Sequence, residues 1–429
     1  MLKDLLQVTT DASDSTPVQV SSGDLNTAES ARAAGVRTAK NLAKKPGKYA
    51  LCMAPKAKYV HEFAIGFGQG VPAFSMKSDA AVITVSVPDA HVDVFQAAAL
   101  GIAKARQLVV APANIATPSG IANQIERATE GNSAFSMHGY HLQKNNFTEV
   151  IGRSSENTPQ LVTVLYKGNA DSNELDLGLA FKGCTFDSGG MNMKPSASVS
   201  KMKKDMGAAA LGVGLLKWLS IAKPKVNVVL GFSFAENAVS STAMRTGDIY
   251  PFKGKSVEIT NTDAEGRLLL ADAMLAMSTQ YPEAPNALIA LGTLTALGKS
   301  VFGGSRIPLW AGAGDCDSAT EFAGDTSGDL VWSLPLDDLF YKNIQSSQIA
   351  DYVNSVSGKG AASGVAAVFL HEMAKLCYGE EIDFSMLDIS SSAMGGDGVC
   401  NYAGEAVHPQ DASGACLNLL IHRILQDAA

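Results

Sequence analysis

The six cysteines of this 429-residue chain are scattered and form no Cys-x-x-Cys pair. A chain of this length can bury a core without disulfide bonds, so a reducing compartment is the simpler expectation. The sequence also has no apolar run that approaches the roughly 18 residues of a membrane span, and its first residues lack the apolar stretch of a signal peptide. We therefore expect a soluble, cytoplasmic protein with no membrane partner.

Positive charge is also in short supply. The chain has 34 basic and 42 acidic residues, which gives a net charge of −8. This balance works against sequence-independent attraction to nucleic acid or to anionic membranes, so binding of nucleic acid is not expected. Hydrophobic residues make up 46% and charged residues 18%, the composition of a globular chain with a sizeable core.

Several well-known catalytic motifs are missing. The segment His371-Glu-Met-Ala-Lys375 carries a lysine where the second ligand of an HExxH zinc site must be. The segment from Gly292 to Ser300 resembles a phosphate-binding loop but has five residues between its glycines where four are needed. No GxSxG motif is present, which argues against a serine hydrolase of the α/β type.

Apolar runs typical of strands alternate with segments of helical spacing. The strand-like runs cover residues 80–87, 175–181, 228–234 and 287–291, and helical patterns cover 94–103, 199–219 and 268–277. This alternation predicts an α/β fold in two domains. We expect an N-terminal α/β domain over residues 1–125, a linker region at about 110–150, and a catalytic domain over 150–429. The second domain is predicted to hold a mixed, largely parallel sheet between helix layers.

Acidic residues stand near the ends of these apolar runs, where open α/β sheets carry their sites. Asp187 lies in a glycine-bearing loop, Asp205 precedes an apolar helix, and Asp263 and Glu265 stand two residues apart before another helix. If that last segment is extended, both carboxylates point to one side and could chelate a cation. Each residue also has a plain structural role open to it, as a turn residue, a first-turn acid or a helix cap.

The motifs around these residues are similar to those of the leucyl aminopeptidase (cytosol aminopeptidase) family M17. Asn261-Thr-Asp-Ala-Glu-Gly-Arg267-Leu resembles the family signature without a mismatch. The family's other motifs follow in the same order, with the resemblance covering roughly residues 110–420. These motifs are Lys182-Gly-x-Thr-Phe-Asp187-Ser-Gly-Gly, Lys194-Pro-Ser, Met202-Lys-x-Asp205-Met-Gly-Ala-Ala and Gly292-Thr-Leu-Thr295.

The resemblance implies a metal-dependent aminopeptidase with two divalent ions per subunit, of Zn, Mn, Co or Mg. The residues that it makes metal ligands are Lys182, Asp187, Asp205, Asp263 and Glu265. Lys194 and Arg267 would be the catalytic residues, with Arg267 also holding a bicarbonate ion that acts as the general base. Such an enzyme would take peptide substrates and assemble as a homohexamer.

The same resemblance implies a pocket for the side chain of the substrate's first residue. The residues expected in it are Met202, Thr293, Leu294, Ala296, Ser390 and Ala393. Most relatives have glycine where this chain has Ala296, which adds a methyl group, and the segment around Ser390 is more polar than theirs. Leucine or a similar apolar residue is the expected preference.

Two other functions stay open on the sequence. A narrower dipeptidase, for instance one that cleaves cysteinyl-glycine, would use the same residues. A hexameric DNA-binding or scaffold protein would not need turnover, although the acidity of the chain disfavours DNA and the seven polar site residues are all present.

Overall fold

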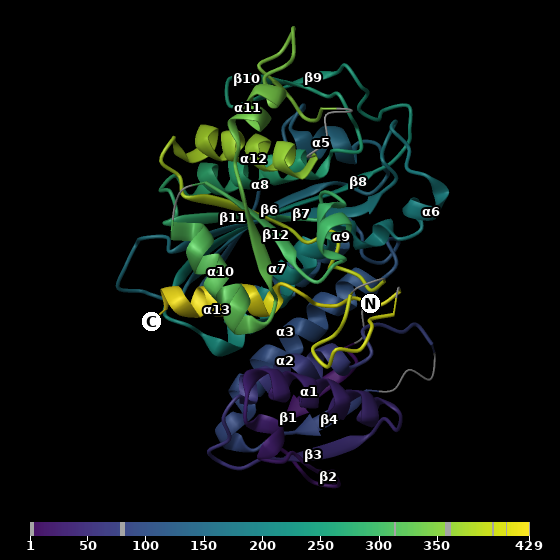
Figure 1. Cartoon of the computed structure of the whole chain (residues 1–429), viewed down its shortest axis with the longest axis vertical. Helices are drawn as coiled ribbons and strands as arrows, with labels where there is room; N and C mark the ends of the chain where they lie inside the picture. The colour runs from purple at the N-terminus through teal and green to yellow at the C-terminus, as the bar shows by residue number, and fades with distance from the viewer. Residues whose placement is uncertain are drawn as a thin grey trace.

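The computed structural model describes residues 4–77, 82–312, 315–356, 362–396, 399–408 and 410–428. Two sheets dominate it, a small one in the N-terminal part and a large one above it in Figure 1, and a third, three-stranded sheet lies at the far end. The predicted α/β fold is confirmed by this arrangement.

The small sheet contains four parallel strands and is covered by helices. Its strands, in spatial order, are β1 (Leu6–Thr9), β4 (Ile83–Ser86), β3 (Lys48–Cys52) and β2 (Thr16–Gln19). Helices α1 (Ala28–Ala43), α2 (Val60–Gly70) and α3 (Val92–Val110) stack between this sheet and the rest of the molecule. The strand expected over 80–87 is therefore shorter, and its first two residues lie outside the described ranges.

The large sheet has eight strands and supports the candidate site. In spatial order they are β13 (Val331–Pro335), β12 (Ile307–Ala311), β15 (Phe384–Asp388), β11 (Ala287–Gly292), β7 (Leu177–Asp187), β8 (Asn227–Asn237), β6 (Gln160–Lys167) and β5 (Phe135–Gly139). The four central strands run parallel, whereas β12 is antiparallel to β15 and β6 is antiparallel to β8. The sheet is thus mixed and largely parallel, as predicted.

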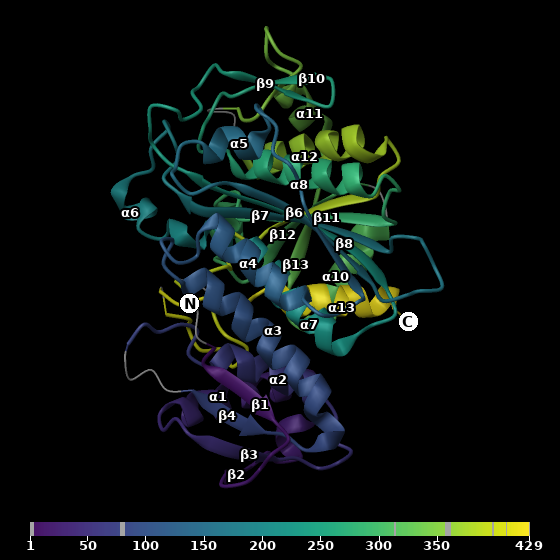
Figure 2. The ribbon, with the colours of Figure 1, turned by 180° about the vertical axis from the view of Figure 1, so that it is seen from behind.

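Helices cover both faces of this sheet, because its central strands are apolar on both sides. One face packs against α5 (Phe147–Gly152), α8 (Gly266–Gln280) and α12 (Ala362–Tyr378), with α11 (Asp338–Ile344) outside them. The other face packs against α4 (Pro118–Thr129), α7 (Gly207–Ala222), α10 (Asp315–Ser327) and α13 (Leu417–Asp427) (Figure 2). Shorter helices, α6 (Ser196–Val199), α9 (Leu297–Phe302) and the 3-10 turn η3 (Met202–Met206), stand at one edge of the sheet.

One hydrophobic core joins the small sheet to the lower face of the large one. It contains Phe63 and Phe95 from the N-terminal helices together with Leu216 and Phe232 from α7 and β8. Helices α3 and α7 can approach closely because a Cβ at Gly101 would lie 2.9 Å from the carbonyl oxygen of Gly214. The two parts are therefore packed as one body.

The segment 110–150, expected as a linker, contains regular structure. Helix α4 and strand β5 lie within it, and β5 pairs with β6 at the edge of the large sheet. The remaining three-stranded sheet has the order β14 (Tyr352–Val353), β10 (Lys255–Glu258) and β9 (Ile249–Phe252). The domain boundaries remain a prediction.

One helical segment, Met202–Ala222, is long and apolar enough to span a membrane, which the sequence reading did not anticipate. In this fold 78% of its most apolar window is buried, because α7 lies beneath the large sheet. Its apolar composition is accounted for by that position.

Helices α1 and α2 cross so closely that the contact tolerates no side chain at Gly66. A Cβ there would lie 1.9 Å from the carbonyl oxygen of Arg32. We expect Gly66→Ala to lower the free energy of unfolding by about 1–3 kcal/mol, because the two backbones must separate. Urea denaturation would measure the change. Gly139→Ala is the control, since nothing lies within 4 Å of a Cβ at that exposed position; equal effects of both changes would contradict the explanation.

Candidate metal centre

Four polar side chains stand where the central parallel strands end. Strand β7 ends at Asp187, β8 at Asn237 and β15 at Asp388, and Thr293 directly follows β11. Because parallel strands bring their carboxyl ends to one edge, segments up to 200 residues apart meet there. This edge holds the acidic residues that the sequence singled out.

Lys182 lies on β7 at the centre of the cluster, and its side chain is buried. Its Nζ atom lies 2.7 Å from Asp205 Oδ2 and 2.8 Å from Glu265 Oε1, and donates to the carbonyl oxygen of Thr293 at 2.6 Å. The hydroxyl of Thr293 donates to Asp205 Oδ1 at 2.7 Å. Lys182 therefore ties together residues from η3, from the turn before α8 and from the end of β11.

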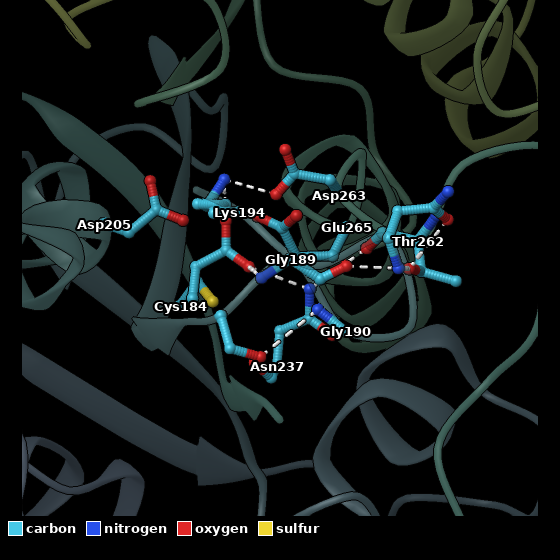
Figure 3. A network of polar contacts seen from close by, with 12 residues as sticks. Cys184, Gly189, Gly190, Lys194, Asp205, Asn237, Thr262, Asp263 and Glu265 are labelled. Atoms are coloured by element: carbon cyan, nitrogen blue, oxygen red, sulfur yellow. Dashed lines mark hydrogen bonds and ion pairs between the residues drawn. The ribbon is translucent and has the colours of Figure 1, made fainter. Parts of the chain in front are cut away.

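Lys194 links the other two predicted carboxylates. Its Nζ atom lies 2.7 Å from Asp187 Oδ2 and forms an ion pair with Asp263. Figure 3 shows Lys194 beside Asp263, with the carboxylates of Asp205 and Glu265 turned toward the same space. The five predicted metal ligands and Lys194 are thus brought together in one cluster, although Asp263 faces Lys194 and Glu265 faces Lys182.

The donor atoms of this cluster fit a divalent cation. Ligand atoms of Asp187, Asp205, Glu265 and Cys184 all lie within 4.8 Å of one another, and all four residues are buried. Glu265 Oε2 is buried and has no hydrogen-bond partner among the described residues. An unpaired buried carboxylate oxygen is costly, and a metal ion is a usual way to satisfy it. Carboxylate oxygens suit Mg, Mn and Zn alike.

The protein groups alone leave this cluster electrostatically unbalanced. Burial raises the pKa of Asp205 to about 7, although Lys182 acts in the opposite direction. Burial also raises the pKa of Asp263 to about 6, helped by the charge of Asp187. Burial alone would lower the pKa of Lys182, but Asp205 and Glu265 hold it well above its usual value. A neutral Lys182, as a metal ligand must be, requires a dication close by to reverse this balance.

Cys184 also belongs to the cluster, although it was not predicted from the sequence as a site residue. Burial raises the pKa of its thiol well above the usual value, and nearby carboxylates act in the same direction. Its Sγ atom donates to the carbonyl oxygen of Phe186 at 3.5 Å. Only a thiolate binds a metal strongly, so Cys184 is better explained as a buried residue that packs beside the cluster.

Asn237 is a supporting residue that the sequence analysis missed. Its amide nitrogen donates to Asp187 Oδ1 at 2.8 Å and to the carbonyl oxygen of Thr262 at 3.0 Å. A second donor, the backbone N–H of Gly189, reaches the same oxygen of Asp187 at 2.8 Å. The signal was present, because Asn237 ends an apolar strand just as Asp187 does. Through these two bonds, Asn237 fixes the end of β7 against the turn that carries Asp263 and Glu265.

Gly266 has no side chain because Lys182 needs its space. A Cβ at this position would lie 2.6 Å from Lys182 Nζ and Cε. The glycine of the Asp-Ala-Glu-Gly-Arg segment therefore serves close packing at the start of α8, since its φ is not in the left-handed range.

A cavity of about 300 Å³ opens beside the cluster. It contains five of the six predicted substrate-pocket residues, which are Met202, Thr293, Leu294, Ala296 and Ser390. Ala393 is not among the described residues that line it, because its side chain is buried beyond β15 and packs against Gly207 at the start of α7. The cavity is also lined by Lys194, Pro195, Ser198, Lys204 and Thr295.

Arg267 is the predicted catalytic residue that does not reach this cavity. Its side chain is buried beside Glu265, and its Nη1 atom donates to the carbonyl oxygen of Asn354 at 2.8 Å. Burial lowers the pKa of Arg267 to about 10, while Glu265 and Asp388 act in the opposite direction. Its Nε atom has no partner among the described residues, so the guanidinium retains a free donor for an anion.

Asp388, also missed as a site residue, holds the wall of the cavity in place. It accepts from the backbone N–H groups of Leu294, Thr295 and Ser390 and from the hydroxyl of Thr295, at 2.7–3.2 Å. Burial raises its pKa, although these donors act against that rise. Asp388 thus clamps the loops after β11 and β15 to each other.

The fold and this cluster define an α/β protein with a candidate carboxylate-rich metal centre. Its family follows from comparison with known proteins. Residues 103–421 match the catalytic domain of the cytosol aminopeptidase family, and the chain belongs to that family.

Curated relatives carry the same family name. A probable cytosol aminopeptidase 1 from Shewanella oneidensis is 33% identical over 350 residues, which cover 80% of this chain and 67% of that protein. A probable cytosol aminopeptidase from Brucella melitensis is 34% identical over 325 residues, which cover 74% and 65%. The chain therefore spans about two thirds of the length of the curated relatives it matches.

Solved structures share the fold. The bottromycin maturation enzyme BotP in complex with Mn superposes with a TM-score of 0.79 at 26% identity, covering 94% of this chain and 88% of BotP. The cytosol aminopeptidase from Coxiella burnetii gives a TM-score of 0.77 at 23% identity and covers 99% of both chains. The two-domain fold of the family thus extends over nearly the whole chain.

Replacement of Asn237 by alanine should weaken metal binding without removing a ligand. Asp187 would lose a charge-assisted hydrogen bond that fixes its orientation, and outer-shell changes of this kind typically cost about 10–100-fold in metal affinity. Calorimetric titration of the metal-free protein with Mn²⁺ would measure the loss. Asn173→Ala is a matched control, because that asparagine bonds to an exposed lysine remote from the cluster. Unchanged affinity in Asn237→Ala would contradict this role.

Proposed function

We propose that this chain is a metal-dependent aminopeptidase that removes the first residue from peptides. The observation that carries the proposal is the buried group of Asp187, Asp205 and Glu265, with an unpartnered oxygen on Glu265, in a chain of the cytosol aminopeptidase family. Two divalent ions bound there would polarise the scissile carbonyl, lower the pKa of a water and bind the substrate's free amine.

The residues divide into ligands and substrate-directed groups. Glu265 lies beside Lys182 and Asp187 beside Lys194, and the resemblance to the family implies that these two acids would be shared by two ions. Lys182 and Asp205 would complete the tighter site and Asp263 the more exchangeable one. The ions would be Zn, Mn, Co or Mg, since carboxylate and amine donors accept each of them. Mn is named for BotP, which supports this donor preference.

Lys194 is the residue placed to act on the reacting carbonyl. It is half-buried at the rim of the cavity and its ammonium is held by Asp187 and Asp263. An ammonium in that position would stabilise the negative charge that develops on the carbonyl oxygen. Arg267 would hold a bicarbonate anion at the start of α8, with the free Nε donor and the helix N-terminus favouring an anion there.

The cavity would take a first residue of about leucine size. Met202, Leu294 and Ala296 supply its apolar contacts. We further propose that the enzyme works in the cytoplasm on peptide substrates, which agrees with the description of its family, and that it assembles as a homohexamer.

Removal of a predicted ligand tests the proposed activity. We expect Asp263→Ala and Glu265→Ala to lower kcat/KM for leucine p-nitroanilide by at least about 100-fold, or about 2.7 kcal/mol of transition-state stabilisation, because each change removes a negatively charged donor. Asp93→Ala, on the exposed side of α3, is the control for a lost carboxylate. If either site variant cleaves the anilide as fast as the unmodified protein, the site assignment is wrong.

The size of the cavity gives a second test. Ala296 is exposed in the cavity wall, so Ala296→Gly should enlarge the space available to the first side chain. We expect kcat/KM for phenylalanyl relative to leucyl anilide to rise by up to about 10-fold, the value of one methyl group in an apolar pocket. A ratio that does not change would show that Ala296 does not limit the first residue.

A further inference from the structure

Lys204 is a cavity residue with no role in the metal cluster. It precedes Asp205 in η3, and its side chain lines the cavity together with Met202, Thr295 and Ser390. Its Nζ atom donates to the carbonyl oxygen of Ser390 at 2.7 Å.

Lys204 differs from the other two lysines of the cavity in its partners. Lys182 and Lys194 each lie within ion-pair distance of two carboxylates. Lys204 has no carboxylate within 4.0 Å in the described parts of the chain, and the Ser390 carbonyl is the acceptor that it meets there. It is thus a half-buried ammonium that forms no direct ion pair with an acidic side chain of the described residues.

The nearby acids are engaged elsewhere. Asp205 is held by Lys182 and by the hydroxyl of Thr293. Asp388 is held by the backbone N–H groups of the cavity loops. Rearrangement of either acid toward Lys204 would break these contacts, so a carboxylate in direct contact with Lys204 would come from a bound ligand. An enclosed ammonium gains most from such a partner, because the low local dielectric strengthens the pair.

The wall around Lys204 suits a carboxylate carried on a short apolar stem. Met202, Leu294 and Ala296 supply apolar surface for methylene groups. Glutamate is close to leucine in size and would place its carboxylate where a leucine places its methyl groups. Lys204 and Thr293 both line this part of the cavity, and the hydroxyl of Thr293 contacts Asp205. Lys194 instead lies beside Asp263.

We infer that Lys204 recognises a carboxylate on the substrate's first side chain, so that N-terminal glutamate and aspartate are cleaved in preference to their neutral isosteres glutamine and asparagine. This inference rests on the proposed aminopeptidase activity and adds an acidic class to its substrates. Lys204 would be a specificity residue, because it would contact the side chain and not the reacting atoms.

The test compares glutamyl, glutaminyl and leucyl anilides on the metal-loaded enzyme. Lys204→Met keeps the length of the side chain and removes its charge, and Lys204→Arg keeps the charge. Lys203→Met is a matched control, because the adjacent lysine is also half-buried but donates to the carbonyl oxygen of Val110 at 2.6 Å, away from the cavity.

We expect the unmodified enzyme to have a higher kcat/KM for the glutamyl than for the glutaminyl substrate by about 10–100-fold, the value of one charge-assisted hydrogen bond. Lys204→Met should abolish that ratio and lower kcat/KM for the glutamyl substrate much more than for the leucyl substrate, since the lost charge matters only to a charged side chain. Lys204→Arg should retain most of the ratio, and Lys203→Met all of it.

A wild-type glutamyl to glutaminyl ratio near one would overturn the inference, and so would an equal loss for all three substrates in Lys204→Met. The dipeptide leucyl-glycine is assayed as well, and a loss confined to it would also overturn the inference, because it would assign Lys204 to the carboxylate of a dipeptide. Cleavage of the leucyl anilide checks the aminopeptidase proposal separately, so the two can fail independently. Calorimetric binding of free glutamate and glutamine to the unmodified protein and to Lys204→Met gives a readout without turnover, and equal affinities in the unmodified protein would also overturn the inference.

Discussion

Repulsion between buried carboxylates governs this molecule. Asp187, Asp205 and Glu265 meet in a space of a few ångströms from which water is largely excluded, and such groups can remain charged only if cations lie among them. Lys182 and Lys194 supply part of that charge. The parallel strands enforce the meeting, because their carboxyl ends share one edge of the sheet. Removal of the positive charge would therefore strain the whole edge, and the fold and the metal would stabilise each other.

Much of the fold could be predicted from the sequence, because apolar runs with β-branched residues leave little choice for buried strands. Local detail was less accessible. Strand β7 continues through polar residues to Asp187, since β8 pairs with it up to Asn237, a long-range contact that no local pattern contains. The expected helix from 199 is broken into α6, η3 and α7, so Asp205 stands in a 3-10 turn. The signature segment before α8 turns, and its two acids face different lysines.

The candidate site shows the same division. The residues of the carboxylate cluster could be singled out because they lie in distinctive motifs, and their role as ligands stays a prediction. The side chains of Ala393 and Arg267 lie outside the cavity lining, since sequence distance from a motif says nothing of the direction in which a side chain leaves the backbone. Lys204 was not singled out from the sequence, because only the folded chain brings η3 and its side chain to the cavity beside Ser390. Tertiary packing decides these cases.

The clamp at Asp388 has a consequence for how such proteins diverge. The carboxylates come from β7, η3 and the turn before α8, whereas the opposite wall belongs to the loops after β11 and β15, which Asp388 fastens together by backbone groups. Because those bonds use N–H groups, the side chains at 296 and 390 can be exchanged without loosening the loops. The preference for the substrate's first residue can therefore change between related proteins while the carboxylates that would hold the metal stay the same.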